Sequence, residues 1–371
     1  MRILYYFTDY PTAMFQWQKY HIFDELERHD CHIVVLSPLD YKTKDEANEA
    51  LIKEFKYGHY NVFMTPHNEE WLYIDTIKEI KSMGIPMILI LFDSLMTPLR
   101  HRKVAPYFDL LMLSQKDESG IFQKYNSNVI VSHYAANPHF FHPIDFVTTK
   151  NRLCFPGTPY GSRTDVINTL AENGFPVDLY FGGDGTSQQG LSSAQRDDIK
   201  DSKLKVLTTL LRTDVGRKVV AGAVAGKLKK KYSGVNLASP MIKKFNSVSL
   251  AETNQIYAEH DLSLSIAAAR NTGNLKHPVM IVHLRNFEIP MSGGVQFCEY
   301  FPELAECFED EKEIIFYHSK EDMIEKARYY LSPTHDSERR IIRLSARKRA
   351  EGEHTWWHRF SKAFDYLRLQ F

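Results

Sequence analysis

Short runs of consecutive apolar residues alternate with longer helical segments through the first 150 residues, and this alternation limits the possible folds more than any other feature. The apolar runs occupy residues 3–7, 32–36, 61–64, 86–92, 110–113 and 129–132. Because the runs are apolar at consecutive positions, the strands are expected to be buried on both faces, as in a parallel sheet covered by crossover helices. Helical patterns at 15–28 and 69–83 separate them. The sequence therefore predicts a doubly wound α/β domain.

A second unit of the same design is predicted after a segment rich in proline and aromatic residues at 135–143. Strand–helix alternation starts again at Leu153, with candidate strands at 152–155, 177–181, 261–266, 294–297 and 313–317. We predict an N-terminal domain over residues 1–145, a C-terminal domain over 146–353 and a last helix over 354–371 that returns to the N-terminal domain. The region near 187–245 is too long for an ordinary connection and is interpreted as an insertion.

The predicted insertion carries a cationic cluster, formed by Arg212, Arg217, Lys218, Lys227, Lys229, Lys230 and Lys231. A stretch of small and apolar residues at 219–226 lies within it, so a helix or hairpin ending in lysines is expected. Two interpretations remain open. The first, which we prefer, is a solvated basic loop; the second is peripheral contact of the 212–231 segment with anionic lipid or an anionic acceptor.

Charge and composition exclude several classes of protein. Lysine plus arginine equals aspartate plus glutamate at 46 each, so no overall field favours nucleic acid, and we expect no nucleic-acid partner. The N-terminus reads as a strand rather than a secretory leader, and no apolar run approaches the roughly 20 residues of a membrane span. A cytoplasmic protein is expected, peripheral on the inner face of the membrane if the basic segment contacts lipid. Four cysteines without metal-ligand spacing indicate buried thiols: Cys31, Cys154, Cys298 and Cys307.

The C-terminal third contains the most informative motif. LRNFEIPMSGG at 284–294 is followed by EYFPEL at 299–304, ARYYL at 327–331 and HTWWHR at 354–359. The order and spacing of these pieces resemble the C-terminal domain of the CgeB-type (spore maturation protein-like) glycosyltransferases, within the GT-B group. A weaker match precedes them, at FPGT (155–158), Arg163 and FGG (181–183).

This resemblance implies a GT-B fold, with two Rossmann-like doubly wound domains facing across a cleft. It implies that the C-terminal domain holds a nucleotide-sugar donor and that the N-terminal domain holds a carbohydrate-containing acceptor. The expected activity is transfer of a hexose or related sugar to a glycan, lipid-linked or protein acceptor.

The motif suggests how the donor is held. If residues 275–287 form a helix that enters a glycine-rich turn, the Glu288 carboxylate can accept hydrogen bonds from both ribose hydroxyls. Gly293 and Gly294 would allow close approach of the backbone to the ligand. Many retaining GT-B enzymes have a second glutamate eight positions earlier, where this chain has Met280. The resemblance therefore leaves the stereochemical course open.

The donor diphosphate requires positive charge. No Asp-x-Asp pair follows a strand, so we expect no metal cofactor. The loop that contains Thr272, Asn274 and Lys276 precedes the proposed helix, and a helix N-terminus can bind phosphate. The remaining candidate donor-binding residues are Arg163, Gly157 and Arg285.

Four residues are candidates for activating an acceptor hydroxyl. Asp9, His67, Asp93 and His133 each follow a predicted strand, where side chains of parallel sheets line a ligand site. Asp9 and Asp93 are the preferred general bases.

Two other functions remain open from the sequence. A GT-B epimerase would alter a nucleotide-sugar without an acceptor, and a non-catalytic protein would only bind one. No P-loop, G-x-G-x-x-G, G-x-S-x-G or H-E-x-x-H motif supports an ATPase, dehydrogenase, esterase or zinc protease.

Overall fold

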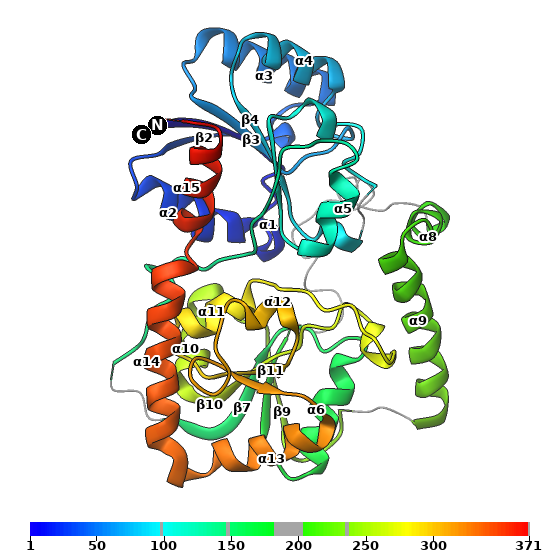
Figure 1. Cartoon of the computed structure of the whole chain (residues 1–371), viewed down its shortest axis with the longest axis vertical. Helices are drawn as coiled ribbons and strands as arrows, with labels where there is room; N and C mark the ends of the chain where they lie inside the picture. Colours follow the sequence, from blue (N-terminus) through cyan, green and yellow to red (C-terminus); the bar gives the residue numbers. More distant parts are fainter. Residues whose placement is uncertain (97–98, 146–148, 182–202, 234–236, 370–371) are drawn as a thin grey trace. The chain divides into compact units, whose positions relative to one another are not determined.

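The computed structural model describes the chain except for residues 97–98, 146–148, 182–202, 234–236 and 370–371. Its contacts divide the chain into two compact units (Figure 1). The described residues of Met1–His133 and Trp356–Phe371 form unit 1, and those of Tyr134–Gln189 and Asp201–Thr355 form unit 2.

Unit 1 is built on a six-stranded parallel sheet in the order β2-β1-β3-β4-β5-β6. The strands are β1 (Arg2–Tyr6), β2 (His32–Leu36), β3 (Val62–Thr65), β4 (Met87–Leu91), β5 (Leu110–Leu113) and β6 (Val129–Val131). All four residues of β3 and β5, and all five of β4, are buried. The prediction of a doubly wound sheet covered on both faces is confirmed for this half of the chain.

Helices cover both faces of this sheet, α3 and α4 on one side and α1, α2 and α15 on the other (Figure 1). Their bounds are α1 (Ala13–Gln18), α2 (Asp24–Glu27), α3 (Lys44–Tyr57), α4 (Ile74–Ser82), α5 (Ser119–Phe122) and α15 (Trp356–Tyr366). A π-helical turn, Lys19–Phe23, joins α1 to α2, so the helix predicted at 15–28 is confirmed as one irregular helix. The helix predicted at 69–83 begins only at Ile74, because Asn68 holds the preceding residues in a turn through its bond to the Glu70 amide.

Helix α15 is attached to unit 1 by a carboxylate from α2. The buried Glu25 side chain accepts hydrogen bonds from the backbone amides of Trp356 (2.9 Å) and Trp357 (3.0 Å). These amides are at the start of α15, where a helix has no internal acceptors for them. Glu25 therefore caps α15 although the two segments lie at opposite ends of the sequence.

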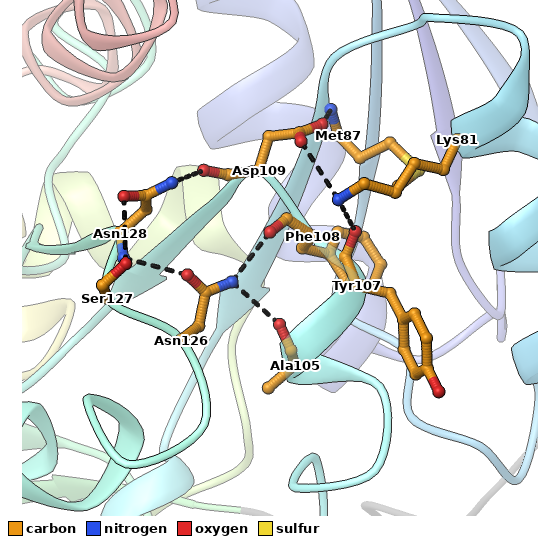
Figure 2. Close-up of polar contacts among 9 residues, drawn as sticks. All are labelled: Lys81, Met87, Ala105, Tyr107, Phe108, Asp109, Asn126, Ser127 and Asn128. Carbon is orange, nitrogen blue, oxygen red and sulfur yellow. Dashed lines mark hydrogen bonds and ion pairs between the residues drawn. The ribbon is translucent and has the colours of Figure 1, made fainter.

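Polar side chains close the amino ends of β4, β5 and β6 (Figure 2). Asp109, directly before β5, accepts a bond from the Met87 amide at 2.9 Å and an ion pair from Lys81 at 3.4 Å. Asn126 donates to two backbone carbonyls before β5, and Asn128 donates to the carbonyl of Asp109 at 3.0 Å. This network satisfies the backbone at one end of the sheet and leaves the opposite, carboxyl end to the loops that carry the candidate site residues.

Unit 2 contains a second six-stranded parallel sheet, in the order β12-β11-β10-β7-β8-β9. The strands are β7 (Lys150–Pro156), β8 (Val177–Tyr180), β9 (Ile242–Phe245), β10 (His260–Ser265), β11 (Gln296–Glu299) and β12 (Ile315–Tyr317). Five of the six were predicted. The sixth, β9, was assigned to the insertion, because three of its four residues are exposed and it has little apolar signal.

Eight helices are described in unit 2. They are α6 (Arg163–Glu172), α8 (Lys203–Leu210), α9 (Asp214–Ser233), α10 (Leu250–Glu259), α11 (Arg285–Met291), α12 (Pro302–Ala305), α13 (Lys320–Leu331) and α14 (Asp336–Glu353). Residues of α6 and α13, among them Leu170 and Met323, share one buried cluster with the strands. Helix α14 packs against α11. Within the described residues no helix is both long and apolar enough to span a membrane.

The helix predicted at 275–287 is wrong. Residues 275–284 are extended or bent, and the helix begins at Arg285. The Val279 carbonyl accepts a backbone hydrogen bond from residue 269, and the Ile281 amide donates one to residue 267; both partners follow β10. Because these backbone groups are already paired, the segment does not form a helix. Glu288 consequently lies in the first turn of α11, not at the end of a longer helix.

Candidate functional site

The strand order of unit 2 reverses between β7 and β10. From β7 the chain proceeds outward through β8 and β9, and then returns to the other side of β7 to form β10, β11 and β12. In open α/β sheets, ligands bind outside the carboxyl ends of the strands at such a reversal. A ligand site is therefore expected at the loops that follow β7 and β10.

Two arginines converge at the carboxyl end of β7. The guanidinium carbon of Arg285 lies 4.8 Å from the ring centroid of Phe155, and that of Arg163 lies 5.8 Å from the same ring. Arg163 begins α6 and Arg285 begins α11. Arg163 also stacks on Tyr160 at 4.3 Å, and Arg285 donates to the carbonyl of Pro156. We call Arg163 and Arg285 the arginine pair.

The arginine pair lacks a carboxylate partner in the described part of the chain. Burial, and then the charge of Arg285, lower the pKa of Arg163 to about 10, and the group that opposes this shift is the Tyr160 phenol rather than a carboxylate. The Nε atoms of both arginines are buried without a hydrogen-bond partner. Two like charges held together with buried, unpaired donors are costly unless an anion completes the site.

His283 lies beside the arginine pair, and sequence reasoning did not identify it. Burial, followed by the charges of Arg285 and Arg163, lowers its pKa well below the ordinary value, so the imidazole is neutral at physiological pH. Its Nε2 atom is buried without a hydrogen-bond partner. The only signal in the sequence was its position two residues before Arg285 in the motif. The site thus offers one neutral and two cationic polar groups.

Glu288 lies one turn after Arg285 in α11 and is 7% exposed. Burial raises the pKa of Tyr257 in α10; the charge of Arg285 opposes this shift and that of Glu288 adds to it. The two charged groups therefore lie near the same phenol. The first turn of a helix favours a carboxylate, because its amides are not used within the helix. The structure therefore places the predicted acidic residue beside the predicted Arg285.

Gly157 directly follows β7 and has a φ of +152°, a conformation that favours glycine. A Cβ atom at this position would lie 2.5 Å from Nη2 of Arg285. A side chain here would displace the Arg285 guanidinium, which explains the glycine in the FPGT motif.

Other candidate donor-binding residues lie in loops with structural roles of their own. The Thr272 hydroxyl is buried and joins the carbonyl of Ala269 to the amide of Val279. Asn274 donates to the carbonyl of Asn271, and Lys276 is exposed. The three belong to, or follow, a single 3-10 turn, Thr272–Asn274, and not to the start of a helix.

Gly293 and Gly294 lie beyond the other end of α11. Gly293 has a φ of +69°, and the amides of Gly293 and Gly294 bond to the carbonyls of Pro290 and Ile289. This pattern is a glycine C-cap of the helix. The structure thus supplies a reason for both glycines that does not involve a ligand.

Asp9 and His67 follow β1 and β3, between which the strand order of unit 1 reverses. The Asp9 carboxylate accepts a bond from Gln16 and an ion pair from Lys19, both at 2.7 Å. His67 is buried, and burial, then His101 and Arg100, lower its pKa to about 3. His67 is therefore neutral, with an Nε2 atom that has no hydrogen-bond partner.

Asp93 and His133 follow β4 and β6 of the same sheet. Asp93 has a φ of +52°, a left-handed conformation that is costly for a residue with a side chain and that is concentrated at functional sites. Its charge acts on the fully buried Glu118, whose pKa is raised to about 8 by burial first and by Asp93 next. His133 makes a 2.9 Å contact between its Nδ1 and the carbonyl of Ser114.

All four cysteines are buried thiols, as the sequence predicted. Cys154 lies in β7 and Cys298 in β11, in the interior of unit 2.

Comparisons with known proteins agree with this geometry. Residues 209–365 match a family model described as glycosyl transferase-like. A search of curated proteins found no match. Among solved structures, the chain is similar to Anabaena Alr3699/HepE in complex with UDP-glucose, with 10% identity, 99% of each chain covered and a TM-score of 0.60.

Two further solved structures have the same architecture. Sucrose-phosphate synthase from Thermosynechococcus elongatus is 10% identical over 99% of this chain and 98% of its own, with a TM-score of 0.58. A glycosyltransferase from Rickettsia africae has the same identity, coverage and TM-score. The whole chain therefore has a GT-B glycosyltransferase fold, and its residues 209–365 are glycosyl transferase-like in sequence.

Proposed function

We propose that this chain transfers a hexosyl or related sugar from a nucleotide-sugar donor to a glycan, lipid-linked or protein acceptor without a metal cofactor. Unit 2 would bind the donor, and unit 1 would activate the acceptor. The finer assignment to the CgeB-type family belongs to this proposal and rests on the motif at 284–294.

The arginine pair carries the proposal. A nucleoside diphosphate leaving group develops negative charge as the sugar departs, and either a metal ion or fixed cations must stabilise that charge. Arg163 and Arg285 bring two guanidinium groups, which bind phosphate oxygens in a bidentate manner, to the carboxyl end of β7. The complexes of HepE with UDP and UDP-glucose support this class of donor.

Glu288 is proposed to bind the ribose. A carboxylate beside Arg285, separated from it by one helical turn, can accept hydrogen bonds from two adjacent hydroxyls while the guanidinium holds the neighbouring phosphate. The Nε2 of His283 is available for a hydroxyl of the donor. Gly157 leaves room for the Arg285 guanidinium. Thr272, Asn274, Lys276, Gly293 and Gly294 are proposed to shape the surrounding loops.

Asp93 is the preferred acceptor base among the four candidates of unit 1. Asp93 follows β4 and has a left-handed backbone, a strained conformation of the kind that functional sites retain. Asp9 is already bound by Lys19, and the low pKa of His67 makes that imidazole a weak base. His133 remains an alternative at the end of β6.

Nucleotide binding by the purified chain tests the donor site. The melting temperature is measured with UDP, GDP, CDP, ADP and dTDP, each with and without a chelator, because a ligand that binds only the native state stabilises it. We expect one nucleotide to stabilise the parent protein equally in both conditions. Arg285→Gln and Arg163→Gln should each weaken the binding of that nucleotide by about 10- to 100-fold, which is the effect of losing a charge-assisted hydrogen bond.

Glu288→Gln should weaken the binding of a nucleoside diphosphate. It should not weaken the binding of inorganic pyrophosphate, because pyrophosphate has no ribose. Arg328→Gln, which alters an exposed arginine on α13, is the matched control and should bind as the parent does. Stabilisation by no nucleotide, or only in the presence of a divalent metal, would contradict the proposed donor site. Turnover of the bound donor without any acceptor would indicate an epimerase, and binding without turnover on any acceptor would indicate a non-catalytic protein.

A further inference from the structure

Helix α9 (Asp214–Ser233) packs against the protein through small residues and leaves apolar residues exposed on its outward face. We propose that this outward face rests on an anionic lipid surface and holds the protein at a membrane. The proposal concerns the insertion alone and does not depend on the donor site.

The inward face of α9 is fixed to unit 2 by close backbone contact. A Cβ atom at Gly222 would lie 2.6 Å from the carbonyl oxygen of Asn271, and one at Gly226 would lie 3.1 Å from Nδ2 of Asn274. Val219, on the same face, is 5% exposed. Helix α9 therefore packs on the 271–274 loop through glycines, and its orientation is set by that contact.

The outward face of α9 carries apolar side chains that the rest of unit 2 does not cover. Val224 and Leu228 are each 55% exposed and lie one turn apart, on the side of the helix opposite Val219 and Gly222. Leu211, in the turn between α8 and α9, is 46% exposed, and Leu207 of α8 is 41% exposed. These four exposed apolar side chains, on two successive helices and the turn between them, form a surface that we call the α8–α9 face.

Cations flank this apolar surface. Arg212, Lys218 and Lys227 are exposed, and none of them forms an ion pair within the described residues. Arg217 pairs with Asp214, the only acidic residue in the described part of α9. The α8–α9 face therefore has a net positive charge, although the whole chain has none.

Apolar residues bordered by lysine and arginine match the chemistry of an anionic bilayer surface. The apolar side chains can enter the boundary between headgroups and acyl chains, while the long cationic side chains reach the lipid phosphates. A nucleic acid would bind the cations but not the leucines, and an apolar protein partner would not require the cations. Anionic lipid is the one occupant that accounts for both.

Vesicle flotation of the full chain tests this proposal. The chain is mixed with vesicles of phosphatidylcholine alone and with vesicles in which about a third of the lipid is phosphatidylglycerol. We expect binding to the second kind only, and weaker binding as salt is raised. Lys218→Gln and Lys227→Gln should each weaken binding about fivefold, because a basic residue near an anionic surface contributes about 1 kcal/mol.

The double variant Val224→Ser, Leu228→Ser retains every charge and should still lose binding. Its matched control is Ile341→Ser, Leu344→Ser on α14, which removes two exposed apolar residues from another helix and should bind as the parent does. Both double variants should melt at the parent temperature, since the altered side chains are exposed. Equal binding to the two kinds of vesicle, binding to neither, or full binding by the Val224, Leu228 variant would overturn the proposal. So would lipid-free self-association that the same variant abolishes, since the face would then contact a second copy of the chain.

Discussion

Several titratable side chains are buried in states that are uncharged at neutral pH, and they lie close to the candidate site residues. Glu118 is fully buried at the end of β5, next to Asp93, and its pKa is raised to about 8. His67 and His101 are both buried, with pKa values lowered to about 3 and about 4. At the residue scale, the surroundings of Glu118, His67 and His101 therefore exclude water strongly enough to suppress charge.

Glu118→Gln should stabilise unit 1 increasingly as the pH rises. The pKa of Glu118 is higher in the folded than in the unfolded state, so its contribution to stability is complete below about pH 4.5 and is lost as the pH rises toward 8. Because glutamine does not ionise, the variant does not lose stability in this way. Relative to the parent, urea denaturation should show a gain on the order of 1 to 3 kcal/mol between pH 5 and pH 8.

The neighbouring Asp117→Asn provides the control, because Asp117 is exposed and should leave the pH dependence unchanged. If the denaturation midpoints of Glu118→Gln and the parent run parallel over this range, Glu118 is not protonated in the folded protein.

At the scale of elements, individual helices are held by contacts from distant parts of the chain. Helix α15 is capped by Glu25 of α2, and α9 is held by glycines against the loop before residue 275. The π-helical turn between α1 and α2 places Phe23 against Tyr5 of β1, with ring centroids 4.8 Å apart. Elements with weak local signals thus acquire their position from packing.

Glu25→Gln should destabilise unit 1 by about 1 to 3 kcal/mol, because one of two buried backbone amides loses its acceptor. Trp356 packs 5.7 Å from Trp17, ring to ring, so tryptophan fluorescence during urea denaturation reports on the loss. Glu27→Gln on the same helix is exposed and should be neutral. An unchanged midpoint for Glu25→Gln would mean that α15 is held by its aromatic residues alone.

At the scale of the whole molecule, both units repeat one plan: a six-stranded parallel sheet whose order reverses once. In both, the candidate site residues follow the carboxyl ends of strands. Both also contain neutral histidines at that end, the buried His67 and His101 in unit 1 and the partly buried His283 in unit 2.

The protein should consequently lose stability in mild acid. The pKa of each of these histidines is lower in the folded state than the ordinary value near 6.5, so the unfolded chain binds more protons, and stability falls as the pH drops below about 6.5. The loss can reach about 1.4 kcal/mol per pH unit for each histidine. His67→Gln should reduce the slope of unfolding free energy against pH between 6.5 and 5, while His59→Gln, at an exposed position, should not. A parent protein equally stable at pH 5 and pH 7 would contradict this expectation.

Local sequence patterns were sufficient for most of the architecture. Eleven of the twelve strands coincide with predicted runs, because a strand buried on both faces is apolar at every position, which the chain shows without its tertiary structure. The motif at 284–294 also indicated Glu288 and Arg285 directly. Strand β9 was missed because an exposed edge strand has no such pattern.

The composition of the site was decided only by the tertiary structure. Arg163 and Arg285 lie far apart in sequence and meet because β7 and β10 are neighbours at the reversal of strand order. His283 became a site residue only when residues 275–284 proved to be extended along the end of β10 rather than helical. The sequence by itself determined most of the strands and singled out the motif at 284–294, since periodicity and motif spacing are local. Which side chains share a site depended on long-range strand pairing, which local patterns do not encode.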